Sequence, residues 1–195
     1  MVWKAYKKEK ANKGVAGVDS ISMEEFEPNR SKHLYKLWNR MASGSYFPPP
    51  VKEVEISKDD GKIRKLGIPT IADRIAQTVI KDYLEPRFEK IFSPSSYGYR
   101  PNKDAHQALA FVRENCKKSD WVIDLDIKGF FDNIDHKKLM LAVEKHVPER
   151  WVCMYIKRRL SMPVLLKSGE LQERNGKGAP QGGVISPLLA NLFLH

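Results

Sequence analysis

The sequence has few cysteines and no long apolar run. Its 195 residues include two cysteines, Cys116 and Cys153, and no C-x-x-C pair. A disulfide framework and a cysteine-based zinc site are therefore excluded, and we expect both thiols to be reduced core residues. No stretch of eighteen uncharged apolar residues occurs, so no membrane span is expected. The start carries neither an apolar signal segment nor an Arg/Ser-rich transit peptide, which favours the cytoplasm of a bacterium.

Internal repeats and low-complexity tracts are also absent, which excludes a solenoid.

Acidic residues are outnumbered by basic ones: the sequence has 24 Asp and Glu and 34 Lys and Arg, and the formal net charge is +10. This excess favours a polyanionic partner, nucleic acid above all, although a basic surface that only aids solubility is the alternative. A hydrophobic content of 42% with four Trp, eight Phe and seven Tyr supplies enough apolar area for a folded core.

Hydrophobic periodicity predicts an α+β fold. Apolar residues recur at helical spacing in five segments, 31–41, 70–86, 105–116, 136–147 and 149–161. We expect Pro86 to kink or stop its helix. Alternating residues around a glycine turn predict a β-hairpin over 51–68, and a second hairpin is expected around 167–170.

Residues 121–127 have the two-residue period of a strand, with four apolar side chains on one face and Val122, Asp124 and Asp126 on the other. Carboxylates at this spacing, next to the aromatic pair 130–131, suit a hard cation such as Mg²⁺. A strand with a merely solvated polar face is the alternative, and the spacing alone leaves both open.

The segment 176–183 contains four glycines and precedes a helix for which we expect Ser186 as N-cap. Backbone amides at this point suit a phosphate, but a plain flexible turn is equally compatible. His136 and His146 have no partners at ligand spacing, so we interpret them as ordinary surface or helix-start residues.

The last helix reaches the end of the chain without a C-cap or polar tail. We therefore expect its apolar face to meet a part of the protein that these residues do not supply, as in a truncated domain. That face consists of Leu188, Leu189, Leu192 and Phe193.

Four blocks occur in order along the chain: Lys58 with GKIRKLGIPT at 61–70 and Asp73-Arg74, then SYGYRP at 96–101, DIKGFFDNIDH at 126–136 and PQGGVISPLLAN at 180–191. Together with NKGVAGVD at 12–19, they resemble the ordered blocks of group II intron reverse transcriptases. The resemblance covers nearly the whole chain.

The resemblance implies a right-hand polymerase with fingers and the first part of the palm, ending before the family's Tyr-x-Asp-Asp block. Residues 1–20 would be a basic N-terminal extension and residues 21–120 the fingers, including the hairpin 51–68. Residues 121–195 would form a partial palm with the glycine-rich loop of the nucleotide pocket.

The implied function is that of an RNA-directed DNA polymerase of a group II intron that also binds intron RNA as a splicing maturase. Its partners would be intron RNA, an RNA template with a DNA primer, and deoxynucleoside triphosphates; a homodimer is left open. A non-catalytic module that binds structured RNA, or a relative that copies RNA into RNA, are the alternatives. Because the second carboxylate block is missing, we expect these 195 residues alone not to polymerise.

The resemblance also assigns roles to residues. Asp126 matches the first catalytic, metal-binding aspartate, and the Ile127 carbonyl matches a backbone ligand of Mg²⁺, whereas Asp124 has no metal role. Phe131 resembles the aromatic gate that selects deoxynucleotides. The nucleotide-binding candidates are Lys52, Lys58, Arg64, Ile127, Phe131 and Gln181. The RNA-binding candidates are Lys4, Lys7, Lys8, Lys10, Lys13, Lys62 and Lys65.

Overall fold

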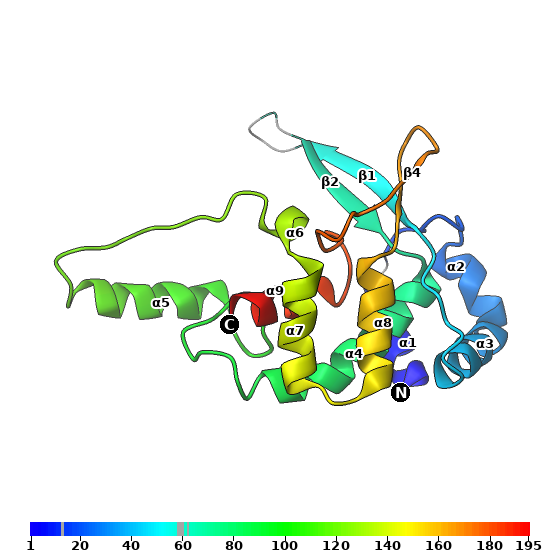
Figure 1. Ribbon diagram of the computed structural model, residues 1–195, viewed down its shortest axis with the longest axis horizontal. Coiled ribbons are helices and arrows are strands. Elements are labelled where there is room, and N and C mark those ends of the chain that lie inside the picture. Colours follow the sequence, from blue (N-terminus) through cyan, green and yellow to red (C-terminus); the bar gives the residue numbers. More distant parts are fainter. Residues whose placement is uncertain (13, 58–60, 62) are drawn as a thin grey trace.

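The computed structural model describes residues 1–12, 14–57, 61 and 63–195. Three of the predicted contact residues, Lys13, Lys58 and Lys62, lie outside the described residues. A body of packed helices carries a small sheet on one side (Figure 1), which confirms the α+β prediction.

The helices and strands follow the chain in the order α1 (Val2–Ala11), α2 (Met23–Phe26), a 3₁₀ turn (Glu27–Asn29), α3 (Arg30–Ala42), β1 (Val51–Ser57), β2 (Ile63–Ile68), α4 (Ile71–Phe88), α5 (Ala105–Cys116), α6 (Phe130–Asn133), α7 (His136–His146), α8 (Arg150–Leu160), β3 (Val164–Leu165), β4 (Leu171–Gln172) and α9 (Ser186–Leu194). The sheet has the order β2-β1-β3-β4. β1 and β2 are antiparallel, with Lys52 opposite Ile68, and β3 pairs with β1 in parallel and with β4 in antiparallel orientation. Both predicted hairpins are confirmed.

Helix α4 forms the centre of the core. Thr70 caps it, since its hydroxyl accepts a hydrogen bond from the Asp73 amide at 3.2 Å. The helix continues through Pro86 to Phe88, so the expected stop at Pro86 is wrong. Pro86 lies in the last turn, where only the bond to the Asp82 carbonyl is lost, and the Glu89 amide still bonds to the Glu85 carbonyl at 2.9 Å.

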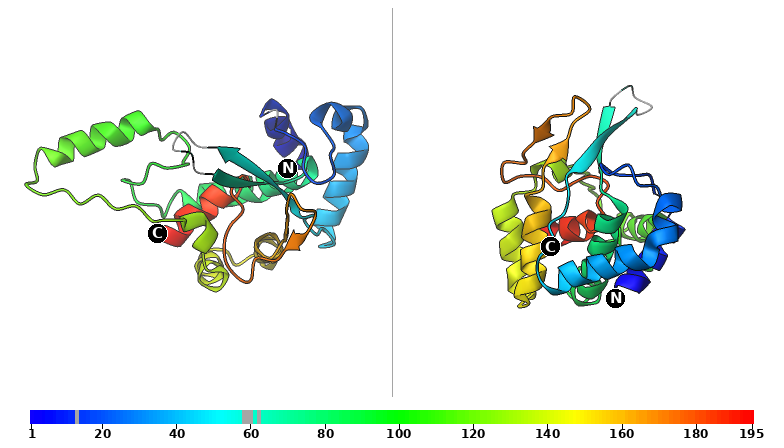
Figure 2. Two further views of the ribbon diagram at one scale, coloured as in Figure 1. Left: turned by 90° about the horizontal axis from the view of Figure 1, so that it is seen from above. Right: turned by 90° about the vertical axis from the view of Figure 1, so that its right-hand side faces the viewer.

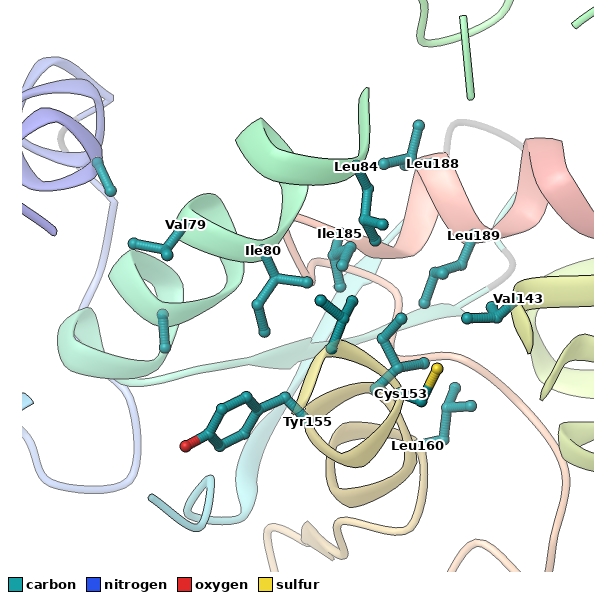
Figure 3. Packing of buried hydrophobic residues seen from close by; sticks show 14 of the residues in the cluster. Val79, Ile80, Leu84, Val143, Cys153, Tyr155, Leu160, Ile185, Leu188 and Leu189 are labelled. Atoms are coloured by element: carbon teal, nitrogen blue, oxygen red, sulfur yellow. The ribbon is translucent and has the colours of Figure 1, made fainter. Parts of the chain in front are cut away.

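Helix α9 is buried in this core, contrary to the expectation of an uncovered apolar face. Leu188, Leu189 and Leu192 are only 3%, 1% and 3% exposed, because α9 packs against α7 and α4. Figure 3 shows Leu189 of α9 beside Val143 of α7, with Leu84 of α4 close to Leu188. The N-cap is Ile185 rather than Ser186, which is itself the first helical residue.

Residues 121–127 do not form the predicted strand. Within the described parts of the chain no strand pairs with them, and an extended segment becomes a strand only through hydrogen bonds to a neighbour. Trp121, Ile123 and Leu125 are accordingly 89%, 82% and 85% exposed. Helix α5, which precedes the segment, is formed as predicted but buries no residue. Both extend away from the helical body in Figure 1.

The two cysteines differ in burial. Cys153 is buried on α8 as expected, but Cys116, at the end of α5, is exposed, so the core prediction for it is wrong. Cys116 is exposed because α5 buries none of its residues.

Helix α1 was not predicted, because its lysines dominate the sequence pattern. Its buried residues Val2, Ala5, Tyr6 and Glu9 nevertheless follow helical spacing, and they pack against α4. The Thr78 hydroxyl on α4 donates to the Glu9 carboxylate at 2.8 Å. The basic N-terminal stretch is therefore an integral part of the fold.

An ion pair joins α4 to the start of α8. Arg87 donates two hydrogen bonds to the Glu149 carboxylate, at 2.7 and 2.8 Å, and the Tyr83 hydroxyl donates a third at 2.7 Å. The hydrogen bonds from Arg87 have the largest effect and the one from Tyr83 the next largest. Together they lower the pKa of Glu149 from its ordinary 4.5 to about 2. The carboxylate is favoured in the folded state, so its contribution to stability is present above pH 4.5 and disappears as the pH falls towards 2.

We therefore expect Glu149→Gln to flatten the acid sensitivity of this chain. The variant should melt at a lower temperature than the parent at pH 6, and the two melting temperatures should converge between pH 4.5 and 2. Thermal unfolding followed by circular dichroism at several pH values measures this. A difference that stays constant down to pH 2 would contradict the assigned role of Glu149.

Candidate active site

A cavity of about 670 Å³ lies between β2 and the segment 126–132. Six predicted site residues line it together: the nucleotide-site candidates Arg64, Asp126, Ile127, Phe131 and Gln181, and Lys65 from the RNA-binding candidates. Lys52 is exposed on β1 and is not among the lining residues. Three distant parts of the sequence thus meet at one concave surface.

A chain of hydrogen bonds crosses this cavity. Arg64 Nε donates to Gln181 Oε1 at 3.0 Å, and Gln181 Nε2 donates to the two carboxylate oxygens of Asp132 at 3.2 and 3.3 Å. The Gln181 amide therefore bridges a cation on β2 and an anion on α6. Asp132 was not predicted as a site residue; its position directly after Phe131 in the block 126–136 was the available signal.

Two adjacent phenylalanines hold α6 in place. The Phe130 ring lies 5.8 Å from Phe131 and 6.0 Å from Phe193 of α9, measured between ring centroids. Gly129, with φ +61°, lets the chain turn into α6, and Asn133 Nδ2 closes the turn by donating to its carbonyl at 2.9 Å. Phe130 thus anchors α6 while Phe131 borders the cavity.

The glycine segment 176–183 is a fixed connector. The amides of Gly178 and Ala179 donate to the carbonyls of Ile134 and Phe131, at 2.8 and 2.7 Å. These amides are already paired and do not face a phosphate. The internal hydrogen bonds also distinguish the segment from a flexible turn, whereas phosphate binding by its other amides stays a prediction.

Close contact with β2 explains one of these glycines. Gly182 has φ +103°, and a Cβ there would lie 3.0 Å from the Gly67 carbonyl oxygen. The Gly67 amide in turn donates to the Gln181 carbonyl at 2.7 Å. Together these contacts hold the Gln181 side chain over the cavity.

His136 is the first residue of α7, which confirms its prediction as a helix-start residue. Its Nε2 lies 2.7 Å from the Gly178 carbonyl oxygen. Arg174, on the other flank of the glycine segment, donates from Nε to the Met162 carbonyl at 3.1 Å. Burial, with the nearby Arg159 charge, lowers the pKa of Arg174 to about 10. His136 thus contacts the glycine segment directly, whereas Arg174 ties the chain that precedes the segment to Met162.

The oxygen donors at the cavity suit a hard cation in type. Asp126 offers a carboxylate and Ile127 a carbonyl, and both residues border the cavity. In the part of the chain that the structure describes, no three acidic, histidine or cysteine side chains come together at metal-binding distance. The residues present therefore fit part of a metal site.

The predicted RNA-binding lysines differ in their surroundings. Lys8 pairs with Asp82 at 2.6 Å, Lys10 with Glu27 at 2.9 Å and Lys65 with Glu53 at 3.3 Å. Lys4 and Lys7 are exposed on α1, and the Lys7 ammonium lies 5.8 Å from the Trp3 ring centroid. Their role in RNA binding stays a prediction.

Comparison with known proteins identifies the class of this fold and site. The family model "Reverse transcriptase (RNA-dependent DNA polymerase)" matches residues 56–195. The chain belongs to this reverse transcriptase family.

No helix among the described residues is long and apolar enough to cross a membrane.

Among curated relatives, the chain is 33% identical over 198 residues to "Group II intron-encoded protein LtrA" of Lactococcus lactis subsp. cremoris, covering 98% of this chain and 32% of LtrA. It is 34% identical over 189 residues to "Protein YkfC" of Escherichia coli (strain K12), covering 92% of this chain and 48% of YkfC. The chain thus spans about a third to a half of the length of these relatives. The resemblance to group II intron reverse transcriptases is confirmed.

Among solved structures, a chain of the "Partial Cas6-RT-Cas1--Cas2 complex" has a similar fold. The TM-score is 0.65 at 22% identity, covering 99% of this chain and 32% of that chain. This likeness confirms the predicted α+β architecture, which the family match identifies as that of a reverse transcriptase. The predicted boundaries at residues 20 and 120 stay predictions.

Proposed function

We propose that this chain is the fingers and partial palm of a group II intron reverse transcriptase that also acts as a maturase. The observation that carries the proposal is the single cavity bordered by Arg64, Asp126, Phe131 and Gln181, residues from three of the four family blocks. The +10 net charge suits an RNA template, a DNA primer and intron RNA as partners.

Each side chain has a proposed task at this cavity. Arg64 binds the triphosphate of an incoming deoxynucleotide, and Gln181 orients Arg64 through their 3.0 Å hydrogen bond. The Phe131 ring excludes a 2′-hydroxyl by steric contact. The Asp126 carboxylate and the Ile127 carbonyl would hold Mg²⁺, which supplies Lewis-acid activation when bound.

We expect Asp126→Asn to abolish most RNA-templated primer extension by the product of the whole reading frame that contains these residues. A metal ligand contributes several kcal/mol to the transition state, which corresponds to a fall of about 100- to 1,000-fold in the rate of extension. Gel-resolved extension of a labelled DNA primer on an RNA template measures it.

Asp124→Asn is the matched control, since Asp124 is an exposed carboxylate two residues earlier and is not among the residues that line the cavity. It should retain the parent rate. Equal losses in the two variants would count against a specific role for Asp126. The 195-residue chain alone should extend no primer, and Asp126-dependent extension by it would overturn that part of the proposal.

A further inference from the structure

A buried glutamine on α4 connects this central helix to the loop that carries Gln181. The Gln77 side chain is 2% exposed, and its Nε2 donates to Asp73 Oδ2 at 3.0 Å. Its Oε1 accepts a hydrogen bond from the Ile185 amide at 3.4 Å. Because Ile185 is the N-cap residue of α9, one side-chain amide links α4 to the start of α9.

The orientation of the Gln77 amide is fixed from the side of Asp73. Asp73 forms a buried ion pair with Arg159 of α8, and an ionised carboxylate only accepts hydrogen bonds. The NH₂ group of Gln77 must therefore face Asp73, which leaves Oε1 for the Ile185 amide. The ion pair between α4 and α8 thus determines where the acceptor for this backbone amide lies.

The backbone of the loop lies directly against the same side chains. Gly183 is buried, and a Cβ there would lie 3.1 Å from both Gln77 Oε1 and Arg159 Nη2. Both side chains are held in place by their bonds to Asp73, so they cannot easily make room for a Cβ. The right-hand view of Figure 2 shows α9 between α8 and α4, the two helices that supply these side chains.

The loop is also attached to β2. The Gly183 amide donates to the Pro180 carbonyl at 3.1 Å, which closes a turn around Gln181. The Gly67 amide of β2 donates to the Gln181 carbonyl at 2.7 Å. The turn that carries Gln181 is therefore held by β2 at its middle and by the buried side chains of α4 and α8 at its end.

We propose that Gln77 is a positioning residue for the cavity. By holding the start of α9, it fixes the turn that places the Gln181 side chain beside Arg64. Gln77 is not among the residues that line the cavity, so it acts through this turn alone. The inference rests on the proposed function in that Arg64 binds the triphosphate of the incoming nucleotide.

Amide hydrogen exchange of this chain, followed by NMR, tests the positioning without any reaction. The probe is the Gly67 amide, since its acceptor is the Gln181 carbonyl. Gln77→Met keeps the length of the side chain but leaves the Ile185 amide without its acceptor. We expect exchange at Gly67, taken relative to the Leu139 amide of α7, to become at least about 10-fold faster. The ratio to Leu139 removes the effect of a general loss of stability.

Thr78→Val is the matched control on the same helix. Thr78 is an equally buried polar residue, 3% exposed, but its hydroxyl donates to Glu9 of α1 and not to the loop. The control should leave the exchange ratio nearly unchanged. Equal ratios in Gln77→Met and Thr78→Val would overturn the proposal.

A second variant disturbs the same contact from the loop. Gly183→Ala should also speed exchange at Gly67, because the added methyl group displaces the turn from Gln77. Gly98→Ala is its control, since a Cβ at Gly98 would meet nothing within 4 Å. An unchanged ratio in Gly183→Ala would contradict the assigned contact even if Gln77→Met failed to fold.

The consequence for nucleotide affinity is measured as the KM for deoxynucleotide in primer extension by the product of the whole reading frame. Gln77→Met should raise this KM about 5- to 10-fold, the size expected when a hydrogen bond to a charged group is misplaced, with a smaller fall in kcat. In a Gln181→Ala background the same substitution should have no further effect on the KM, because the side chain that it positions is gone. An undiminished effect in that background would overturn the proposal.

The two measurements separate this inference from the proposed function. If the parent protein extends no primer, the polymerase proposal fails, and the exchange ratio at Gly67 still decides whether Gln77 holds the turn. If the parent extends primers and Gln77→Met has the parent KM, the positioning role is refuted and the polymerase proposal stands.

Discussion

Replacing Arg159 with methionine should destabilise the chain by about 3–5 kcal/mol, because the Asp73 carboxylate would remain buried without its cation. The two residues are 3% and 2% exposed and form a close ion pair between α8 and α4. Tyr46 and Gln77 also donate hydrogen bonds to Asp73, at 3.1 and 3.0 Å. Burial, followed by the Asp73 charge, raises the pKa of Tyr46, so these groups form one interdependent buried network.

Urea unfolding monitored by circular dichroism measures this loss. Asp73→Asn/Arg159→Met should be more stable than Arg159→Met alone, since the amide removes the uncompensated charge but keeps an acceptor for Tyr46. Lys8→Met is the exposed control: its pair with Asp82 is solvated and should contribute less than about 1 kcal/mol. A similar loss in the free energy of unfolding in Arg159→Met and Lys8→Met would show that burial does not determine how much an ion pair contributes to stability.

Leu189→Ala should lower the free energy of unfolding by about 2–5 kcal/mol, the range for deleting a fully buried leucine side chain. Leu189 is 1% exposed, and Figure 3 shows it on α9 beside Val143. The same urea titration measures the effect. The prediction follows from the packing of α9, where the sequence pattern alone suggested an uncovered face.

Leu194→Ala provides the control on the same helix, since Leu194 is 58% exposed and its truncation should change the free energy by no more than about 0.5 kcal/mol. Comparable small changes in both variants would mean that α9 does not belong to the core in solution.

Local signals predicted the elements that local interactions can stabilise. Helix α4 combines a Thr70 cap with apolar residues at helical spacing, and α7 does the same with Asp135 as its cap. Helix α8 has no side-chain cap and was predicted from its apolar spacing alone. Residues 121–127 have an equally clear alternation but form no strand, because a strand depends on hydrogen bonds to a partner distant in sequence. Helix α1 was missed for the opposite reason: its lysines concealed a buried face that becomes evident only against α4.

The same distinction between local signals and long-range contacts holds for the site. The blocks around Arg64, Asp126, Phe131 and Gln181 could be recognised in the sequence one by one, but no spacing rule states that residues 64 and 181 form a hydrogen bond. Asp132, which completes that chain of bonds, was missed because its partner lies 49 residues away.

The sequence by itself determined the reverse transcriptase family, the main helices and hairpins, and the basic character of the chain, because each of these is written in composition, periodicity or short ordered motifs. Only the tertiary structure decided which lysines are paired with acids, that α9 is buried, and that the glycine segment is a hydrogen-bonded connector. The physical reason is that burial, ion pairing and cavity shape depend on residues far apart in the chain, and only folding brings these together.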